Sequence, residues 1–325
     1  MVSYNVRYFG HALRGLASTR RPKRGIASAL AALDPLADLI CLQEVETISV
    51  RSRLAFSRHA QADEPQLEAF MASLGEAFAA AGKPCPYKAF YFRAHSYGPA
   101  RMPIYTTGLA VLVHLGRVRV VGNNAATPHK ITHHHVVMMR ERKQTRICAH
   151  LHVEFGGRPL HIFNTHLSLP TPFAREFWTV REKMGYGVNQ VKEAESLAAL
   201  IRSVAGDDPY VVCGDFNSAP GSPVYRYLTE QIGMVAAQER LGLCDPRTPR
   251  GFPTAGIARL RMHLDHFFSH PRVSWLDMEG TSRFGDKLSP FHGLSDHMPL
   301  IARFKIEPQA LTPGGNESKY QIQKA

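Results

Sequence analysis

Four short polar motifs, spread over nearly the whole chain, constrain what this sequence can fold into more than any other feature. Each motif puts a carboxylate, a carboxamide or an imidazole at or just past the end of an apolar, strand-like run. The four are Ser3-Tyr4-Asn5-Val6, Leu42-Gln43-Glu44-Val45, Gly214-Asp215-Phe216-Asn217-Ser218 and Leu294-Ser295-Asp296-His297-Met298-Pro299-Leu300. Two further stretches, Asn164-Thr165-His166-Leu167 and Leu264-Asp265-His266-Phe267, lie in the gaps between them. Because strand ends hold polar groups in fixed geometry, this pattern predicts that distant segments converge on one site.

Apolar periodicity predicts an α/β protein in which strands outnumber helices. We expect strands at 2–9, 38–45, 87–92, 107–115, 146–155, 158–165, 210–213, 264–268 and 298–304. We expect helices at 23–33, from 65 to about 81, at 189–204 and from 222 onward. The Gly156-Gly157 pair predicts a hairpin, which argues against a purely parallel sheet. The pattern fits two mixed, mostly antiparallel sheets packed face to face with helices outside.

Length and composition favour one folded domain. The chain has 325 residues, and motifs at both of its ends that must converge on one site argue for a single domain over residues 1–307. The polar tail at 308–325 contains Pro313-Gly314-Gly315 and is expected to be disordered. No apolar stretch is long enough for a membrane span and no signal peptide is visible, so we expect a cytoplasmic protein. The five cysteines are expected to be small buried hydrophobes in a reducing compartment.

The formal net charge of +12 is unusual and its excess is clustered. One cluster follows the first predicted strand, a second follows the strand that ends in Glu44, and a third lies in mid-chain. They comprise Arg14, Arg20, Arg21, Lys23 and Arg24; Arg51, Arg53 and Arg58; and Arg140, Arg142, Lys143 and Arg146. Such a surface attracts polyanions, either nucleic acid or an anionic membrane face. The alternative is a solvated basic face with no ligand.

Taken in this order, the motifs resemble those of the endonuclease/exonuclease/phosphatase metallohydrolases, over roughly residues 1 to 306. The resemblance implies a four-layer α/β sandwich of two packed sheets flanked by helices, with the site at one edge of both sheets. It also implies hydrolysis of a phosphate ester by attack of water, with Mg²⁺ as cofactor and Mn²⁺ as a substitute. A shared site geometry serves many phosphate esters, so the resemblance does not identify the substrate.

Glu44 is the best candidate for a metal ligand from the residues alone. It ends an otherwise apolar strand, where burying a carboxylate is costly unless a cation or hydrogen bonds compensate. The alternative is a glutamate on the rim of the sheet, paired with a nearby arginine. The resemblance implies that Asn5 lies beside Glu44 and that Asp296 also lies on the metal side.

The candidate catalytic residues are Asp215, Asn217, His166, His297 and Asp265. Positions i and i+2 of an extended segment point the same way, so Asp215 and Asn217 can both reach the site while the residue between them packs inward. The resemblance implies that Asp215 orients or deprotonates the water, or protonates the leaving oxygen. It implies that Asn217 and His166 contact the phosphate, that His297 is a general base or a positive partner, and that Asp265 orients His297.

We therefore expect a metal-dependent phosphodiesterase, and its charge favours a nuclease. The alternatives are a phospholipid- or sphingomyelin-type phosphodiesterase and a sugar- or inositol-phosphate phosphatase. A further alternative is a non-catalytic protein that binds nucleic acid or membranes. Aromatic and basic residues interleave over 168–188, which suits stacking on bases, contact with lipid, or ordinary packing of a loop. We expect a monomer without a stable protein partner.

Overall fold

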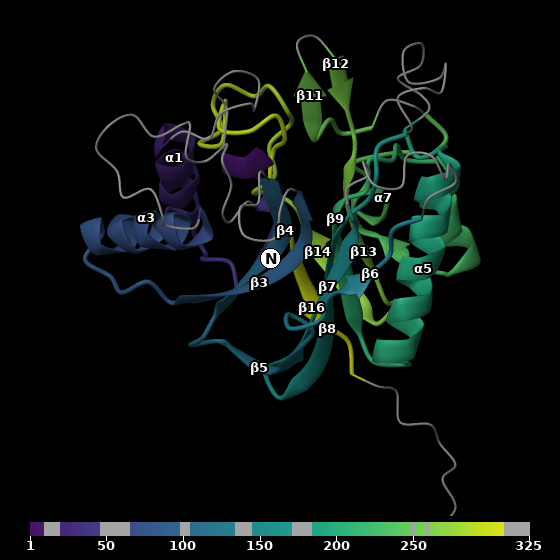
Figure 1. Cartoon of the computed structure of the whole chain (residues 1–325), viewed down its shortest axis with the longest axis horizontal. Coiled ribbons are helices and arrows are strands. Elements are labelled where there is room, and N and C mark those ends of the chain that lie inside the picture. The colour runs from purple at the N-terminus through teal and green to yellow at the C-terminus, as the bar shows by residue number, and fades with distance from the viewer. Residues whose placement is uncertain are drawn as a thin grey trace, which may run out of the picture.

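The computed structural model describes residues 1–9, 20–45, 66–97, 105–133, 145–170, 184–248, 251–257 and 260–308 (Figure 1). Two sheets form its centre. The first has the strand order β15 (Leu300–Ile301), β1 (Val2–Asn5), β2 (Leu39–Val45), β4 (Tyr105–His114) and β3 (Tyr87–Tyr97). The second has the order β10 (Val235–Ala236), β13 (Asp265–Ser269), β9 (Tyr210–Asp215), β8 (Arg158–His166), β7 (Ile147–Phe155) and β5 (Val118–Asn123), and β6 (His129–Lys130) also pairs with β7. Within these described sheets β1–β2 and β8–β9 pair in parallel and the other pairs are antiparallel, as predicted.

Three hydrophobic clusters divide the molecule into four layers. The central cluster joins the two sheets and includes Cys41, Val111, Ile162 and Cys213. A second cluster packs helices α1 (Arg20–Ala31) and α3 (Gln66–Ala80) on the outer face of the first sheet. The third packs α5 (Val188–Ala205), α6 (Pro223–Arg226) and the π-helix η5 (Tyr227–Gln231) on the second sheet. The predicted four-layer sandwich is therefore confirmed (Figure 1).

Burial on both faces explains why the central strands are apolar without alternation. In β2, Leu39 and Cys41 face the second sheet, whereas Ile40 and Leu42 face α1 and α3. A strand covered on both sides buries every side chain, so its sequence reads as a continuous apolar run.

Several element boundaries differ from the sequence prediction. The strand expected at 2–9 ends at Asn5, because a short 3-10 helix, η1 (Arg7–Phe9), follows it. The strand expected at 298–304 is divided between β15, on the first sheet, and β16 (Arg303–Ile306), which pairs with β14 (Val273–Asp277). The small helix α7 (Ala237–Arg240) and the hairpin of β11 (Ala255–Ile257) and β12 (Leu260–Met262) were not predicted.

Among the helices of the described segments, none is both long and apolar enough to cross a membrane. All five cysteines are free, and four of them are buried as predicted, three in strands (Cys41, Cys148 and Cys213) and one outside them (Cys244), whereas Cys85 is half-buried. The tail expected to be disordered lies outside the described residues from position 309 onward.

Candidate active site

The ends of β1, β2, β8 and β9 meet at one edge of the two sheets and bring the polar motifs together. The carboxylate oxygen Asp215 Oδ2 is their common centre. Asn5 Nδ2 donates to it at 3.0 Å, and His166 Nε2 and His297 Nε2 lie 3.5 and 3.7 Å away. Glu44 joins the group through Oε1, which accepts from Asn5 Nδ2 at 3.2 Å and lies 3.9 Å from His166 Nε2. Segments more than 200 positions apart in the chain thus share one polar centre, as the motif order predicts.

A β-bulge directs Glu44 toward this centre. In the pairing of β2 with β4, Leu42 opposes Ala110 and Val45 opposes Gly108, so the chain between Leu42 and Val45 leaves the regular register. Glu44 itself has a φ of 54°, in the left-handed region that costs a non-glycine residue about 1–2 kcal/mol. Bulges re-aim side chains next to active sites, and strain of this kind persists where the surrounding structure enforces it.

The Asp215–Asn217 segment combines the predicted alternation of side chains with an Asx turn. Phe216 is fully buried and packs in the cluster beneath α5, while the residues on either side of it reach the site. The backbone N–H of Asn217 also donates to Asp215 Oδ1 at 2.9 Å, which is the Asx turn expected from an Asp at this position. Asn217 Nδ2 lies 2.9 Å from the Leu167 carbonyl oxygen and 3.2 Å from His166 Nε2, so the two predicted phosphate-contacting side chains are neighbours.

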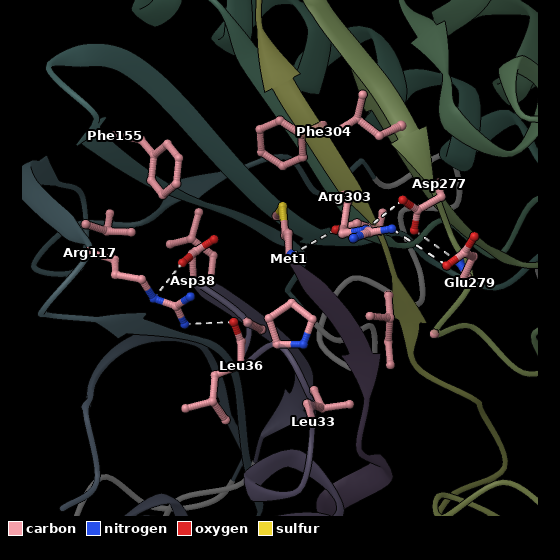
Figure 2. Close-up of a pocket in the computed structure, with 18 of the residues that line it drawn as sticks. Met1, Leu33, Leu36, Asp38, Arg117, Phe155, Asp277, Glu279, Arg303 and Phe304 are labelled. Carbon is pink, nitrogen blue, oxygen red and sulfur yellow. Dashed lines mark hydrogen bonds and ion pairs between the residues drawn. The ribbon is translucent and has the colours of Figure 1, made fainter.

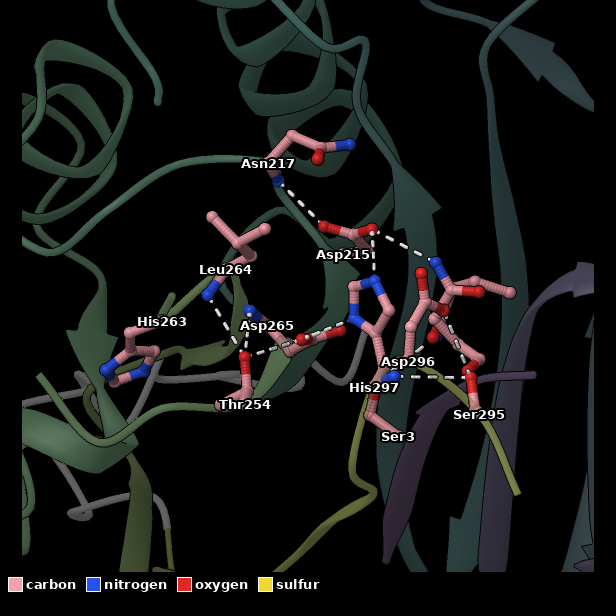
Figure 3. A network of polar contacts seen from close by, with 12 residues as sticks. Ser3, Asp215, Asn217, Thr254, His263, Leu264, Asp265, Ser295, Asp296 and His297 are labelled. Carbon is pink, nitrogen blue, oxygen red and sulfur yellow. Dashed lines mark hydrogen bonds and ion pairs between the residues drawn. The ribbon is translucent and has the colours of Figure 1, made fainter. Parts of the chain in front are cut away.

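His297 and Asp265 form a hydrogen-bonded pair at the centre of Figure 3. His297 Nδ1 lies 2.9 Å from Asp265 Oδ2, and its other nitrogen faces Asp215. This is the arrangement expected if Asp265 orients His297. The nearby His263 does not belong to this group, because it points away from Asp215 and stacks on His266 with ring centroids 4.7 Å apart.

Burial and neighbouring charges compete in setting the pKa values of this site. It raises the pKa of Asp215 to about 7, against the opposing charge of His297. Burial alone would lower the pKa of His297, but the negative charges of Asp265 and Asp215 outweigh it and raise that pKa to about 10. His166 shows the opposite balance, because burial, with Arg146 and His297 nearby, lowers its pKa well below 6.5. The site therefore favours a charged His297 between two carboxylates and a neutral His166.

The donor set fits a hard divalent cation. Glu44, His166 and Asp215 each offer one ligand atom, and these atoms lie within 4.8 Å of one another. A second group with the same property consists of Asp215, Asp265 and His297, which are already hydrogen-bonded or paired among themselves. Carboxylate oxygens held this close in a buried setting repel each other, and a cation of the Mg²⁺ type relieves that repulsion.

Asp296 and Asn5, which are predicted metal ligands, both contact Arg7 in the structure. Arg7 Nη1 forms an ion pair with Asp296 Oδ2, and Asp296 belongs to neither of the two ligand groups. The backbone N–H of Arg7 donates to Asn5 Oδ1 at 3.0 Å, so the Nδ2 end of Asn5 is the one that faces the carboxylates. Both residues lie at the site, and their roles as ligands remain predictions.

Several polar residues to which the sequence analysis assigned no role form hydrogen bonds that connect the segments of the site. Gln43 Nε2 donates to Asn164 Oδ1 at 2.8 Å and to Ser3 Oγ at 3.1 Å, which links the two sheets directly beneath Glu44. From α5, Gln190 Nε2 donates to the Asn217 carbonyl oxygen at 2.8 Å, and the buried carboxylate of Glu193 accepts from the backbone N–H and hydroxyl of Ser168. The polar side chains of Gln43 and Asn164 inside apolar strands are the one sequence signal that could have identified them.

Most of the predicted polyanion surface lies outside the described residues. This holds for residues 10–19 and 51–58, for Arg140, Arg142 and Lys143, and for the aromatic residues at 173–178. Tyr186, from the end of the same aromatic segment, is described and is 52% exposed.

A cavity of about 390 Å³ lies at the opposite edge of the sheets, near the starts of β1 and β2 (Figure 2). Five of its charged side chains are paired with one another: Arg117 with Asp38 at 3.0 Å, and Arg303 with Asp277 at 2.6 Å and with Glu279 at 3.6 Å. Since none of the motif residues lines it, this cavity is not the site of the chemistry.

Comparison with known proteins agrees with this geometry. The model of the Endonuclease/Exonuclease/phosphatase family matches residues 2–297. Nocturnin of Mus musculus is 28% identical over 184 residues, which cover 54% of this chain and 40% of nocturnin. The chain thus spans less than half the length of the curated relatives it matches.

Solved structures of low sequence identity share the fold. ANGEL2, a 2′,3′-cyclic phosphatase, has a TM-score of 0.59 at 18% identity, covering 93% of each chain. TDP2 of D. rerio, solved with a single-strand DNA product, has a TM-score of 0.54 at 17% identity and covers 94% of this chain and 97% of its own.

Proposed function

Because the chain belongs to the endonuclease/exonuclease/phosphatase family, and is therefore a metal-dependent phosphoester hydrolase, we propose that it cleaves phosphodiesters and acts as a nuclease. The observation that carries the proposal is the convergence of Asn5, Glu44, His166 and His297 on the buried carboxylate of Asp215. This arrangement combines an acid–base pair, a cation-binding carboxylate and neutral phosphate-binding groups in one place.

The residues divide the work of hydrolysis among them. A divalent cation, held by Glu44 with Asp215 beside it, would supply positive charge to the phosphate as negative charge develops there. In this proposal His166 and Asn217 contact a non-bridging phosphate oxygen. The attacking water forms the new P–O bond as the ester P–O bond breaks. Asp215 and His297 face each other, so one can take the proton of the water and the other can give a proton to the leaving oxygen.

Two observations support nucleic acid as the substrate. The net charge of +12 attracts a polyanion, and the structurally similar TDP2 was solved with a single-strand DNA product. ANGEL2, a 2′,3′-cyclic phosphatase of similar structure, is an example of the same fold acting on another phosphoester, and the substrate is therefore tested directly.

The test is a panel of substrates assayed with Mg²⁺, with Mn²⁺ and with EDTA. The panel contains single-stranded DNA, duplex DNA, RNA, sphingomyelin vesicles, bis-p-nitrophenyl phosphate and phosphomonoesters, and Asp215→Asn protein prepared in parallel controls for contaminating nucleases. We expect Mg²⁺-dependent cleavage of DNA or RNA that EDTA and the substitution both abolish. Turnover of a phosphomonoester or of sphingomyelin, with none on nucleic acid, would overturn the nuclease assignment and leave the metal-dependent site in place.

Salt dependence provides a second test of the substrate. Each phosphate neutralised on binding releases counterions, so KM for a nucleic acid should rise steeply with salt. Replacing Arg20, Arg21 and Arg24 together by Gln should flatten that dependence and raise KM with little change in kcat, because such contacts bind substrate and transition state equally. An unchanged salt slope would remove this cluster from the substrate-binding surface.

A further inference from the structure

Thr254 lies directly behind the His297–Asp265 pair. Its hydroxyl and the His297 imidazole both contact the same carboxylate oxygen of Asp265. Thr254 Oγ1 donates to Asp265 Oδ2 at 2.6 Å, the same oxygen that lies 2.9 Å from His297 Nδ1. Thr254 is fully buried, so its hydroxyl cannot touch a substrate in solution. Figure 3 shows the three side chains in line, with His297 between Asp265 and Asp215.

The hydrogen bonds that the Thr254 hydroxyl oxygen accepts determine the direction of its hydroxyl hydrogen. A hydroxyl has one donor and two acceptor lone pairs. The backbone N–H groups of Leu264 and Asp265 both donate to Thr254 Oγ1, at 3.0 and 3.1 Å, and so occupy both lone pairs. The remaining hydroxyl hydrogen therefore goes to Asp265 Oδ2, which must act as an acceptor.

This assignment determines the polarity of the next hydrogen bond. A carboxylate only accepts hydrogen bonds. With the Thr254 hydrogen directed to Asp265 Oδ2, His297 Nδ1 therefore donates the second hydrogen bond to that carboxylate oxygen. His297 Nε2 is then the nitrogen that can exchange a proton with Asp215 or with a water molecule. A hydrogen bond on one ring nitrogen sets the role of the other in this way.

The backbone keeps the hydroxyl in position. The N–H of Thr254 donates to the Met262 carbonyl oxygen at 2.9 Å, and its own carbonyl oxygen accepts from the N–H of Met298 at 2.7 Å. The next residue, Ala255, forms an isolated β-bridge with His297. Thr254 thus connects the β11–β12 hairpin to both the segment that carries Asp265 and the segment that carries His297.

We propose that Thr254 is a positioning residue for the hydrolytic reaction, which orients Asp265 and fixes His297 with its Nδ1–H toward Asp265 and its Nε2 toward Asp215. The inference rests on the proposed function, since it assigns His297 a part in proton transfer. Nothing in the local sequence around Pro253-Thr254-Ala255 marks this threonine, because its partners come from other segments.

The experiment compares Thr254→Val, which keeps the shape and removes the hydroxyl, with Thr254→Ser, which keeps the hydroxyl. The matched control is Thr281→Val, because the Thr281 hydroxyl also bonds backbone, donating to the Ile301 carbonyl oxygen at 2.9 Å and accepting from the Ile301 N–H at 2.7 Å. Kinetics with bis-p-nitrophenyl phosphate should show kcat lowered about 10- to 100-fold by Thr254→Val with KM unchanged, the range typical for loss of a hydrogen-bond partner behind a catalytic group. Thr254→Ser should regain most of that loss, and Thr281→Val should not lower kcat.

A double-mutant cycle separates positioning from general destabilisation. In an Asp265→Ala background the Thr254→Val substitution should no longer lower kcat, because the group through which it acts is gone. Equal losses in both backgrounds would overturn the proposal. So would a folded Thr254→Ser protein with kcat as low as that of Thr254→Val. If Thr254→Val does not fold, the serine variant still decides, since the proposal requires it to be active.

An activity-independent readout distinguishes failure of this inference from failure of the proposed function. In protein labelled with ¹⁵N-histidine, a protected Nδ1–H resonance that disappears in His297→Gln identifies the His297 hydrogen bond. We expect it in the wild type, in Thr254→Ser and in Thr281→Val, and we expect its loss in Thr254→Val. A resonance that persists in Thr254→Val would refute the role of the hydroxyl, whether or not any substrate in the panel is cleaved.

Discussion

Replacing Gly214 by Ala should damage both the stability and the activity of this protein. Gly214 lies in β9, immediately before Asp215, with a φ of 147° that side chains rarely allow. Its parallel partner is Thr165 of β8, and a Cβ built on Gly214 would lie 1.9 Å from the Thr165 carbonyl oxygen. That oxygen belongs to the backbone of a central strand, so no side-chain rotation can relieve the overlap.

The expected magnitude combines two effects. Holding a non-glycine residue in this backbone region costs about 1–3 kcal/mol, and forcing extra volume into a packed strand interface costs about 1–3 kcal/mol more. We therefore expect the free energy of unfolding to fall by about 2–6 kcal/mol, a large fraction of the roughly 5–15 kcal/mol of a typical domain. If β9 moves by about 1 Å to accept the methyl group, the displaced Asp215 should also lower kcat by about 100-fold.

Urea unfolding monitored by circular dichroism, together with kcat on bis-p-nitrophenyl phosphate, measures both effects. Gly75→Ala is the matched control, because a Cβ at Gly75 in α3 would have no atom within 4 Å. A helix interior favours Ala over Gly by up to about 1 kcal/mol, so this substitution should stabilise the protein slightly. A Gly214→Ala protein with the wild-type unfolding midpoint would falsify the assigned close approach of β8 and β9.

Three further predictions concern the titratable side chains. Glu44→Gln should lose the increase in melting temperature that Mg²⁺ produces in the wild type, because a ligand stabilises only the state that binds it; equal Mg²⁺ affinity by calorimetry would exclude Glu44 as a ligand. Asp215→Ala and His297→Ala should each lower kcat at saturating metal by about 100-fold or more, the usual scale for a positioned acid or base, and near-normal kcat in either variant would remove that residue from the mechanism. Burial, together with the neighbouring imidazoles, lowers the pKa of His150 from 6.5 to about 4, so the unfolded chain takes up a proton at that residue at a higher pH than the folded protein does. Stability should therefore fall as pH decreases from about 6.5 to about 4, and melting curves of His150→Gln between pH 7 and pH 4 should show a smaller fall than the wild type.

The sequence by itself determined the layered fold and the membership of the site. Continuous apolar strands such as β2 must be covered on both faces, which requires two sheets with helices outside. Polar groups at the ends of such strands predicted one shared site, and the resemblance of the motif order to a known family implied that Asn5, Glu44, His166 and Asp215 belong to it. The layers depend on local periodicity and the site on the order of short motifs, and the chain carries both in its own sequence.

Only the tertiary structure decided the orientation of the site side chains and their hydrogen-bond and ion-pair partners. The bulge that turns Glu44, the Arg7 side chain against Asp296 and the hydroxyl of Thr254 behind Asp265 all depend on contacts between remote segments. Local periodicity specifies which side of a strand is buried, but it contains no information on register, bulges or partners across a sheet. Register, bulges and cross-sheet partners are determined when the two sheets pack. Packing leaves each buried polar group only a few possible hydrogen-bond partners, and these partners are brought together only in the folded chain.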